Sequence, residues 1–321
     1  MKVVITDYEY QDVEKERKIL EAAGIVLDEC QCRTEQALID ACREADGVIV
    51  QYCAITERVI RAMERCRVII KYGIGVNNID VDAASAKGIY VCNVPDYGVD
   101  EVSNHAIAMM LALSRGLKSL NKSLTSGAWG YAPVVPLHRM AGSTLGLVGL
   151  GRIPSLVAKK MAGFGLRILA YDPFARPEAA RKLGVELVEF DTLVAESDYI
   201  SIHCPLTPRT QGLFGPETFR RMKSTAILVN TARGPVIQQQ ALEEALRTGE
   251  LAGAGLDVYE QEPLPKDSPL LHMSNVICTP HCAWYTEEAV TAVQEKAAQE
   301  AANVLTGHAP WHAVNVAAVK Q

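Results

Sequence analysis

The sequence predicts an α/β protein with two doubly wound parallel sheets. Short apolar runs rich in Val and Ile alternate with amphipathic stretches through the first hundred residues, and the same alternation restarts near residue 144. Such alternation is typical of parallel strands connected by helices. The chain has 321 residues, which is more than one ordinary core needs and fits two domains.

Four runs in the first half are expected to be buried strands, because each is short and rich in β-branched residues. They are Lys2–Thr6, Gly47–Val50, Val68–Lys71 and Ile89–Cys92. Helices are expected between them at Asp12–Ala23, Thr34–Glu44 and Thr56–Arg65. A longer helix is expected from Val99 to about Leu120. The breaks at Asn93–Pro95 and Gly98 just before it mark a plausible domain boundary.

The second half repeats the pattern. Its expected strands are Thr144–Gly149, Arg167–Tyr171, Tyr199–His203, Ala226–Asn230, Gly253–Asp257 and Val276–Cys278. Its expected helices include Pro154–Ala162, Gln238–Thr248 and Glu287–Leu305. The last of these lies beyond the second sheet and is expected to return to the first domain. We therefore expect one domain to combine residues 1–98 with 287–321 and the other to span 99–286.

Composition excludes several classes of function. The formal net charge is −6, so no broad cationic surface is available for direct binding of nucleic acid. No apolar run is long enough to cross a bilayer, and the N-terminal segment turns polar too early for a secretory signal. We therefore expect a cytoplasmic protein that does not contact membranes. The nine cysteines are expected to be reduced thiols, and neither the Cys30/Cys32 pair nor the Cys278/Cys282 pair has the partners that a zinc site needs, so no metal is expected.

A glycine-rich turn follows the strand that ends near Val148. Its sequence, Gly149-Leu150-Gly151-Arg152-Ile153-Pro154, is nearly the G-x-G-x-x-G pattern of dinucleotide-binding turns. The first glycine allows the tight turn and the second lets the backbone approach a pyrophosphate. The amides of Arg152 and Ile153 would face the phosphates from the positive end of a helix. Pro154 replaces the third glycine, and a proline is tolerated there because an N–H in the first helical turn has no intrahelical acceptor.

An aspartate at the end of the next strand strengthens this interpretation. Asp172 lies 23 positions after Gly149, close to the spacing expected for the residue that binds the adenosine ribose hydroxyls. Its carboxylate would repel a 2′-phosphate, so the sequence favours NAD over NADP. The alternative is that Asp172 only caps the turn that it forms with Pro173.

Three segments at predicted strand ends carry groups suited to one reaction. Arg233 offers a planar fork of donors for a carboxylate, His281 titrates in the range needed for proton transfer, and Glu262 can orient and stabilise the imidazole. Ligands of open α/β sheets bind beyond the carboxyl ends of the strands. We therefore expect these three residues to converge on one cleft. Each one alone would be weak evidence.

The sequence resembles the D-isomer-specific 2-hydroxyacid dehydrogenase family over essentially the whole chain. The segments that carry the resemblance are VGLGRI at Val148–Ile153, YDP at Tyr171–Pro173, HCPLT at His203–Thr207, NTARG at Asn230–Gly234, LDVYEQEP at Leu256–Pro263 and TPH at Thr279–His281. The resemblance implies a flavodoxin-like substrate domain and a Rossmann NAD domain. It also implies hydride transfer between NAD and C2 of a D-2-hydroxy or 2-oxo acid.

The resemblance implies a role for each matching residue. Arg233 would bind and polarise the substrate, Glu262 would orient the base, and His281 would be the general acid/base. His203, Asp257 and the backbone around Thr231 would contribute to cofactor binding, with Asp257 on the nicotinamide amide. The segment Lys71-Tyr72-Gly73-Ile74-Gly75 looks like the family's loop over the substrate carboxylate, although Asn77 stands where an aspartate is expected.

The segment from His281 to Glu287 is most similar to the C-terminal-binding-protein branch, whose members are NAD-binding transcriptional corepressors. By that resemblance Trp284 would line the substrate pocket and face an apolar substituent, although it could equally be a packed interface residue. The family is generally dimeric through the second domain, so a homodimer is expected. We expect no regulatory domain of the kind that some phosphoglycerate dehydrogenases carry.

The sequence is also compatible with two other functions. The chain could be an NAD-responsive binding protein of corepressor type with incidental dehydrogenase activity. It could also act as formate and phosphite dehydrogenases do, on substrates without a C2 hydroxyl. The sequence does not identify the substrate: glyoxylate, hydroxypyruvate and larger 2-oxo acids all remain open, whereas phosphoglycerate would want more cationic groups than Lys71 and Arg233.

Overall fold

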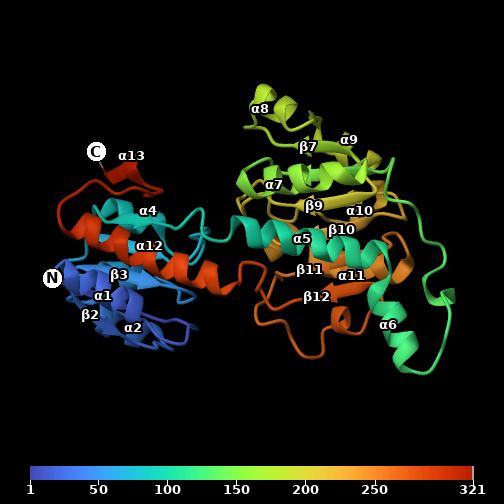
Figure 1. The fold of residues 1–321 in the computed structure, drawn as a ribbon. Helices are drawn as coiled ribbons and strands as arrows, with labels where there is room; N and C mark the ends of the chain where they lie inside the picture. The colour runs from blue at the N-terminus through green and yellow to red at the C-terminus, as the bar shows by residue number, and fades with distance from the viewer. Residues whose placement is uncertain (320–321) are drawn as a thin grey trace. The chain divides into compact units, whose positions relative to one another are not determined.

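The computed structural model describes residues 1–319, which form two compact units. Unit 1 comprises Met1–Gly98 and the chain from Tyr285 onward, and unit 2 comprises Val99–Trp284. The chain thus returns to unit 1 two residues before the position expected from the sequence. Figure 1 shows how the helix after Tyr285 joins the N-terminal strands. No helix among residues 1–319 is long and apolar enough to cross a membrane.

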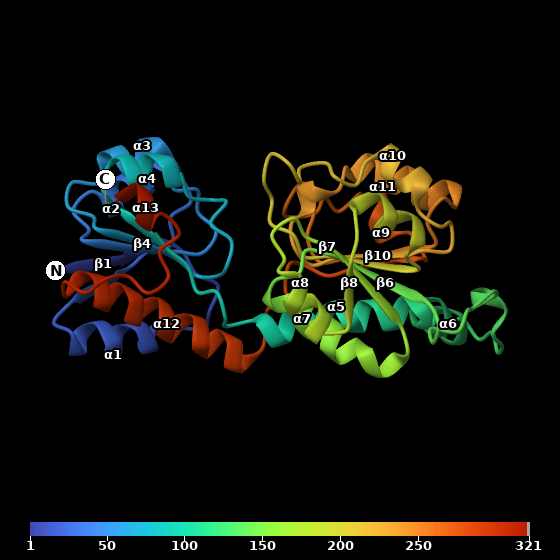
Figure 2. The same ribbon diagram turned by 90° about the horizontal axis from the view of Figure 1, so that it is seen from above.

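Unit 1 contains a five-stranded parallel sheet in the order β2-β1-β3-β4-β5. Its strands are β1 (Lys2–Ile5), β2 (Val26–Glu29), β3 (Gly47–Val50), β4 (Val68–Lys71) and β5 (Tyr90–Cys92). Two helices, α1 (Glu14–Ala22) and α12 (Glu287–Leu305), cover one face of the sheet, as Figure 2 shows. The helices α2 (Glu35–Cys42), α3 (Glu57–Ala62) and α4 (Val81–Ala86) cover the other face. A short helix, α13 (Val316–Val319), follows α12.

Side-chain caps fix where four of these helices begin. The side chains of Thr34, Thr56, Asp80 and Thr286 each accept a hydrogen bond from the backbone N–H three residues later. Each cap satisfies one of the N–H groups that have no intrahelical acceptor, which typically stabilises the helix by about 1 kcal/mol. The loops before α2 and α3 are therefore held where they leave the carboxyl ends of β2 and β3.

Unit 2 contains a seven-stranded parallel sheet in the order β12-β11-β10-β9-β6-β7-β8. Its strands are β6 (Thr144–Val148), β7 (Arg167–Tyr171), β8 (Val185–Leu187), β9 (Tyr199–Ile202), β10 (Ile227–Asn230), β11 (Gly253–Leu256) and β12 (Val276–Cys278). One face packs on α5 (Val99–Ser114), α7 (Arg152–Met161) and α8 (Pro177–Lys182). The other face packs on α9 (Phe190–Glu196), α10 (Pro216–Arg221) and α11 (Gln239–Thr248). Both units therefore have the predicted architecture, parallel sheets covered by helices on both faces.

The structure corrects the sequence expectations in two places. The long helix expected from Val99 to Leu120 is two helices, α5 and α6 (Leu117–Thr125), which are separated by Gly116 with a φ of 59°. A Cβ at Gly116 would lie 2.4 Å from a methyl carbon of Val134, so the break needs glycine. The strands β2 and β8, which lie at the edges of the two sheets, were not expected from the sequence.

Candidate active site

The glycine turn of unit 2 has the backbone that a close ligand approach requires. Gly149 has a φ of +99°, and a Cβ there would lie 3.2 Å from the backbone of His203 and Cys204. A Cβ at Gly151 would meet no atom within 4 Å, so this side of the turn is open. Gly151 is also the N-cap of α7, and Pro154 is buried in the first turn of that helix. The proline that departs from the sequence pattern is therefore accommodated by packing.

Asp172 is tied directly to this turn. One carboxylate oxygen accepts the backbone N–H of Leu150 at 2.8 Å, and the other accepts the N–H of Phe174 at 2.8 Å. The bond to Leu150 ties the end of β7 to the glycine turn after β6, and the bond to Phe174 orients the carboxylate within its own turn. Each oxygen keeps a lone pair for a further donor, such as a ribose hydroxyl.

Two further residues at the same sheet edge fit a bound dinucleotide. Burial lowers the pKa of His203 to about 3, so its ring is neutral and pairs with the Ser201 hydroxyl at 2.8 Å. The hydroxyl of Thr231 is buried and has no hydrogen-bond partner within residues 1–319. A buried hydroxyl without a partner is costly unless a ligand satisfies it. The open side of Gly151 and this unsatisfied hydroxyl are therefore consistent with the expected cofactor.

Arg233 lies in a loop locked by the last residue of β10. The Asn230 side chain accepts the N–H of Ala232 at 3.0 Å and donates to the carbonyl of Arg233 at 2.9 Å. One guanidinium nitrogen of Arg233 donates to the carbonyl of Ala232 at 2.6 Å. A guanidinium carries five N–H donors in a planar fork, a geometry that suits a carboxylate.

Gly234 brings this loop against the loop that carries Glu262. A Cβ at Gly234 would lie 1.9 Å from the backbone carbonyl of Tyr259, so no other residue fits without moving one of the loops. Tyr259 in turn donates its N–H to Oε1 of Glu262 at 2.9 Å. Its hydroxyl donates to the carbonyls of Leu256 and Thr279, at 3.0 and 2.9 Å. Tyr259 is a positioning residue that sequence reasoning missed, because its hydrogen bonds to Glu262 and Thr279 are formed only in the fold.

His281 and Glu262 form a hydrogen-bonded pair. Nδ1 of His281 lies 2.7 Å from Oε2 of Glu262, and both side chains are about one-third exposed. Burial by itself raises the pKa of Glu262, but the hydrogen bond and charge of His281, the N–H of Tyr259 and the charge of Arg233 together lower it below its ordinary value. The carboxylate is therefore ionised and can only accept, which leaves Nε2 of His281 to exchange a proton with a ligand.

Asp257 holds the loop on which His281 lies. It is buried, and its carboxylate accepts the hydroxyl of Thr279 at 2.5 Å and the N–H groups of Cys282 and Ala283, each at 2.9 Å. Its carbonyl accepts the N–H of His281, whose φ of 53° is unusual for a residue other than glycine. These hydrogen bonds use much of the acceptor capacity of Asp257, the residue that the sequence analysis assigned to the nicotinamide amide.

Two side chains complete this loop. Nε2 of His105, on α5, lies 3.0 Å from the Thr279 hydroxyl, a contact that no sequence motif indicates. The indole N–H of Trp284 donates to the carbonyl of His281 at 3.0 Å, which fixes the indole beside the loop that carries His281. In unit 2 the structure thus brings Arg233, Glu262, His281 and Trp284 onto neighbouring loops at the carboxyl edge of the sheet.

The remaining expected residues lie in unit 1, at the end of β4. The ammonium of Lys71 donates to the carbonyl of Gln51 and lies 5.6 Å from the centre of the Tyr52 ring. Tyr72 is buried, and its hydroxyl donates to Glu16 at 2.5 Å, so its side chain faces the core rather than a ligand. Gly73 has a φ of +139°, a conformation that favours glycine, and the side chain of Ile74 is partly exposed. The loop Lys71–Gly75 can therefore offer backbone groups and Ile74 to a ligand.

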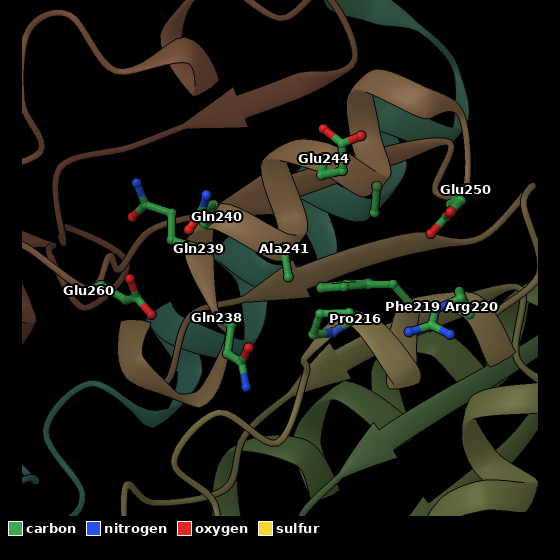
Figure 3. A pocket seen from close by; sticks show the side chains of 11 residues that line it. Pro216, Phe219, Arg220, Gln238, Gln239, Gln240, Ala241, Glu244, Glu250 and Glu260 are labelled. Atoms are coloured by element: carbon green, nitrogen blue, oxygen red, sulfur yellow. The ribbon is translucent and has the colours of Figure 1, made fainter.

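Hollows elsewhere do not contain the expected residues. One of about 560 Å³ lies between α10 and α11 in unit 2, where glutamines and glutamates line it (Figure 3). Another, of about 510 Å³, lies at the ends of β1, β2 and β3 in unit 1. Within residues 1–319 no group of three or more His, Cys, Asp or Glu side chains is placed to hold a metal ion.

Comparisons with known proteins give a consistent result. Residues 107–283 match the family model described as "D-isomer specific 2-hydroxyacid dehydrogenase, NAD binding domain". A glyoxylate reductase of Korarchaeum cryptofilum is 40% identical over 89% of this chain and 88% of its own length. A D-3-phosphoglycerate dehydrogenase of Methanocaldococcus jannaschii is 40% identical over the whole chain, which spans 60% of that relative's length. The solved D-lactate dehydrogenase of Aquifex aeolicus, complexed with NAD and lactic acid, has a TM-score of 0.87 at 30% identity and covers 95% of this chain and 96% of its own.

Proposed function

Because this chain belongs to the D-isomer-specific 2-hydroxyacid dehydrogenase family, we propose that it moves a hydride between NAD and C2 of a D-2-hydroxy or 2-oxo acid, with His281 as its acid/base. The observation that carries the proposal is the 2.7 Å contact between His281 and Glu262 beside Arg233. An NAD-dependent dehydrogenase of this family needs a carboxylate anchor and a proton carrier, and these residues supply both.

Different residues of unit 2 would bind different parts of the cofactor. The open backbone of Gly149 and Gly151 and the first amides of α7, at Arg152 and Ile153, suit a pyrophosphate. Asp172 would accept the ribose hydroxyls. Near the reacting end, the proposed contacts are the Thr231 hydroxyl, a remaining lone pair of Asp257, and the neutral ring of His203. When bound, NAD supplies the nicotinamide that accepts or donates the hydride.

The substrate would be held by its carboxylate and oriented by its oxygen. Arg233 would bind the substrate through its guanidinium and polarise it. In the oxidative direction Nε2 of His281 takes the proton from the C2 hydroxyl as the hydride leaves C2. In the reductive direction the imidazolium returns a proton to the new alkoxide. Glu262 stabilises the charged ring, so each direction starts from a different protonation state of His281.

Unit 1 would contribute to substrate binding through the loop Lys71–Gly75. The support is local: Gly73 has a backbone that favours glycine, and the side chain of Tyr72 is anchored in the core. These features hold the loop's backbone in one conformation, which suits recognition of a small anion by N–H groups. In this proposal unit 1 is the substrate-binding domain and unit 2 the NAD-binding domain.

The test is turnover of a panel of 2-oxo acids, measured as the loss of NADH fluorescence. Glyoxylate, hydroxypyruvate, pyruvate and phenylpyruvate sample small and large substituents. We expect at least one to be reduced with kcat/KM far above the background of the His281→Ala variant. If formate or phosphite were oxidised and no 2-oxo acid were reduced, the proposed reaction would be wrong.

A binding role of corepressor type is the second candidate, since the segment His281–Glu287 resembles that branch and Trp284 lies fixed within it. A protein that only senses NADH does not need an acid/base pair, and the His281–Glu262 contact therefore favours an enzyme. If NADH bound tightly while no acid in the panel was reduced, the binding role would be preferred.

We also propose that the protein is a cytoplasmic homodimer. All nine cysteines are free thiols, which suits a reducing compartment. The apolar side chains exposed on α6 and the segment after it, among them Trp129 and Tyr131, suit a second copy of the chain.

A further inference from the structure

Three hydrogen-bonded side chains of unit 2, which we call the His105 network, end at the turn that carries His281. Nε2 of His105 lies 3.0 Å from the hydroxyl of Thr279, and this hydroxyl lies 2.5 Å from Oδ1 of Asp257. Helix α5, which carries His105, packs against β11 and β12, the strands that lead to Asp257 and Thr279 (Figure 1). The His105 side chain is 25% exposed and that of Asp257 is 1% exposed, so the network runs from the surface of unit 2 into its interior.

The hydrogens of the network follow from what each group can donate. A threonine hydroxyl carries one hydrogen and a carboxylate only accepts, so the hydrogen of Thr279 points to Asp257. The Thr279 oxygen is then left to accept a hydrogen bond from His105, which requires an N–H at Nε2. Oδ1 of Asp257 lies 3.9 Å from Nε2 and favours the same assignment by its charge. His105 is therefore the donor that fixes the rotation of the Thr279 hydroxyl.

Asp257 links this hydroxyl to the turn of His281. Its Oδ1 also accepts the N–H of Cys282 and its Oδ2 accepts the N–H of Ala283, each at 2.9 Å. Its backbone carbonyl accepts the N–H of His281 at 2.8 Å. His281 has a φ of 53°, and a residue other than glycine keeps such a backbone only where its surroundings hold it. The orientation of the Asp257 carboxylate is part of what holds this turn.

Thr279 is also linked to the hydrogen-bond partner of His281. The carbonyl of Thr279 accepts the hydroxyl of Tyr259 at 2.9 Å, and the N–H of Tyr259 donates to Oε1 of Glu262 at 2.9 Å. The N–H of Thr279 itself donates to the carbonyl of Leu256 at 2.9 Å. A displacement of Thr279 would therefore reach both members of the His281–Glu262 pair, which meet at 2.7 Å.

We propose that His105 is a positioning residue for the proposed reaction: its hydrogen bond to Thr279 holds the turn of His281 in the conformation in which Nδ1 meets Glu262. This inference rests on the proposed function and adds to it a residue that no sequence motif indicates. His105 acts through Thr279 and is not itself the acid or the base. Because the rate of a proton transfer depends steeply on alignment, loss of the His105 bond should lower kcat and leave KM nearly unchanged.

The test begins with two substitutions that separate shape from hydrogen bonding. His105→Leu removes the donor, whereas His105→Gln keeps an N–H at the same number of bonds from Cβ as Nε2 of histidine. With the 2-oxo acid that the protein reduces best, we expect kcat of His105→Leu to fall about 10-fold and KM to stay within about twofold. His105→Gln should keep at least about one-third of the kcat of the unmutated protein.

His272→Leu is the matched control, because it makes the same change at an exposed histidine of unit 2. His272 precedes β12, so it lies at the amino edge of the sheet, away from the network at the carboxyl edge. This variant should keep the kcat of the unmutated protein. If His272→Leu lowered kcat as much as His105→Leu, or if His105→Gln were as slow as His105→Leu, the inference would be wrong.

A double-mutant cycle tests whether His105 acts through Thr279. Thr279→Val keeps a similar shape without the hydroxyl, whereas Thr279→Ser keeps the hydroxyl. Adding His105→Leu to Thr279→Val should lower kcat by no more than about twofold, but adding it to Thr279→Ser should still lower kcat about 10-fold. Losses that multiply in the His105→Leu/Thr279→Val variant would show that His105 acts by another route, contrary to the inference.

Amide hydrogen exchange separates this inference from the proposed reaction, because it needs no turnover. The amides of His281, Cys282 and Ala283 all donate to Asp257, and they can be followed in the protein without cofactor. Their exchange should become about threefold to tenfold faster in His105→Leu and return to the original rate in His105→Gln, while the amides of α11 stay unchanged. This result would support the network even if no 2-oxo acid is reduced. Unchanged exchange of these amides in His105→Leu would overturn the inference even if 2-oxo acids are reduced.

Discussion

Nδ1 of His281 lies 2.7 Å from Oε2 of Glu262, while Oε1 of the same carboxylate accepts the N–H of Tyr259 at 2.9 Å. The carboxylate is therefore held by the backbone on one side and orients the imidazole with the other. Gly234 brings the Arg233 loop against Tyr259, so the loops that carry Arg233 and Glu262 are positioned through one contact.

Glu262→Gln should slow reduction of a 2-oxo acid more than oxidation of the hydroxy acid. The amide can still accept a hydrogen bond, but it no longer stabilises the imidazolium that reduction requires. We expect the reductive rate at neutral pH to fall about 10- to 100-fold, in the range of positioned acid–base catalysis, and the oxidative rate to fall less. Pre-steady-state rates in both directions provide the measurement, because cofactor release can mask the proton step. Equal losses in both directions would contradict this role.

The same substitution should change the acid stability of the protein. The folded-state pKa of Glu262 is lowered, so its ionised form stabilises the fold above the ordinary pKa of 4.5, and this contribution is lost as pH falls through the lowered value. The difference in urea midpoint between the unmutated protein and Glu262→Gln should therefore be largest near neutral pH and shrink below about pH 4. A difference that stayed constant down to pH 3 would argue against the ion pair.

Arg233→Ala should nearly abolish turnover while leaving NADH affinity within a few-fold. In the proposed mechanism the fork would donate charge-assisted bonds to the substrate, and removing such donors typically costs about 10²–10³ in kcat/KM. Arg247→Ala is the control, since the Arg247 side chain is exposed on α11, and this variant should behave as the unmutated protein does. Near-normal kcat/KM in Arg233→Ala would place the carboxylate site elsewhere.

Asp172→Ala should reduce the preference for NAD over NADP. The carboxylate is expected to accept ribose hydroxyls and to repel a 2′-phosphate, so we expect the ratio of kcat/KM values for the two cofactors to fall about 10- to 100-fold. Asp172→Asn separates charge from geometry, since its amide oxygen can still accept one of the N–H groups of Leu150 and Phe174. Equal use of both cofactors by the unmutated protein would contradict the assignment of Asp172 to the ribose hydroxyls.

The architecture was predictable because strands buried on both faces are apolar without interruption. Gly47–Val50 and Val68–Lys71 were located to the residue for this reason. Two of the four edge strands were not predicted: β2 exposes three of its four residues, and β8 is only three residues long with Glu186 exposed, so neither forms an apolar run. Backbone pairing holds these two strands, and such pairing leaves no hydrophobic signal in the sequence.

Candidate site residues could be proposed from the sequence where a side chain carries suitable chemistry, but not where a residue only positions another. Motif and strand-end position led to Arg233, Glu262 and His281, and the structure places His281 2.7 Å from Glu262. Their roles remain predictions. The roles of Tyr259 and His105 depend on hydrogen bonds to Thr279, whose partners lie 20 and 174 positions away in the sequence. Tyr72 shows the reverse case: its motif predicted a ligand contact, but its side chain is buried against Glu16.

The Glu16 contact predicts a second pH effect, opposite in sign to that of Glu262. Burial raises the pKa of Glu16, which the bonds from Tyr72 and Gln294 only partly offset. A raised folded-state pKa means that the contribution of Glu16 to stability is fully present below its ordinary pKa of 4.5 and is lost as pH rises through the raised value. Relative to Glu16→Gln, the unmutated protein should therefore lose stability as pH rises above the ordinary pKa of 4.5, as measured by urea midpoints. A parallel pH profile in both proteins would mean that Glu16 titrates normally.

The exposed apolar residues of unit 2 predict a homodimer. No residue of α6 is buried, and Leu117, Leu124, Trp129, Tyr131 and Val135 are all exposed on α6 or the segment after it. Trp129 is 92% exposed, and both views show α6 at the periphery of unit 2 (Figures 1 and 2). Monomeric proteins rarely expose apolar side chains in such a group, whereas a second copy of the same surface would bury them.

We therefore expect light scattering at micromolar concentration to give twice the mass of the chain. The double variant Trp129→Ser/Tyr131→Ser should raise the dimer dissociation constant about 100-fold or more, because buried aromatic residues contribute most to such interfaces. Phe174→Ser is the matched control: Phe174 is 86% exposed in unit 2, but follows β7 rather than α6. A monomeric unmutated protein would contradict the dimer. A double variant as dimeric as the control would place the interface on a different surface, since the aromatic side chains of the segment after α6 would then contribute nothing to association.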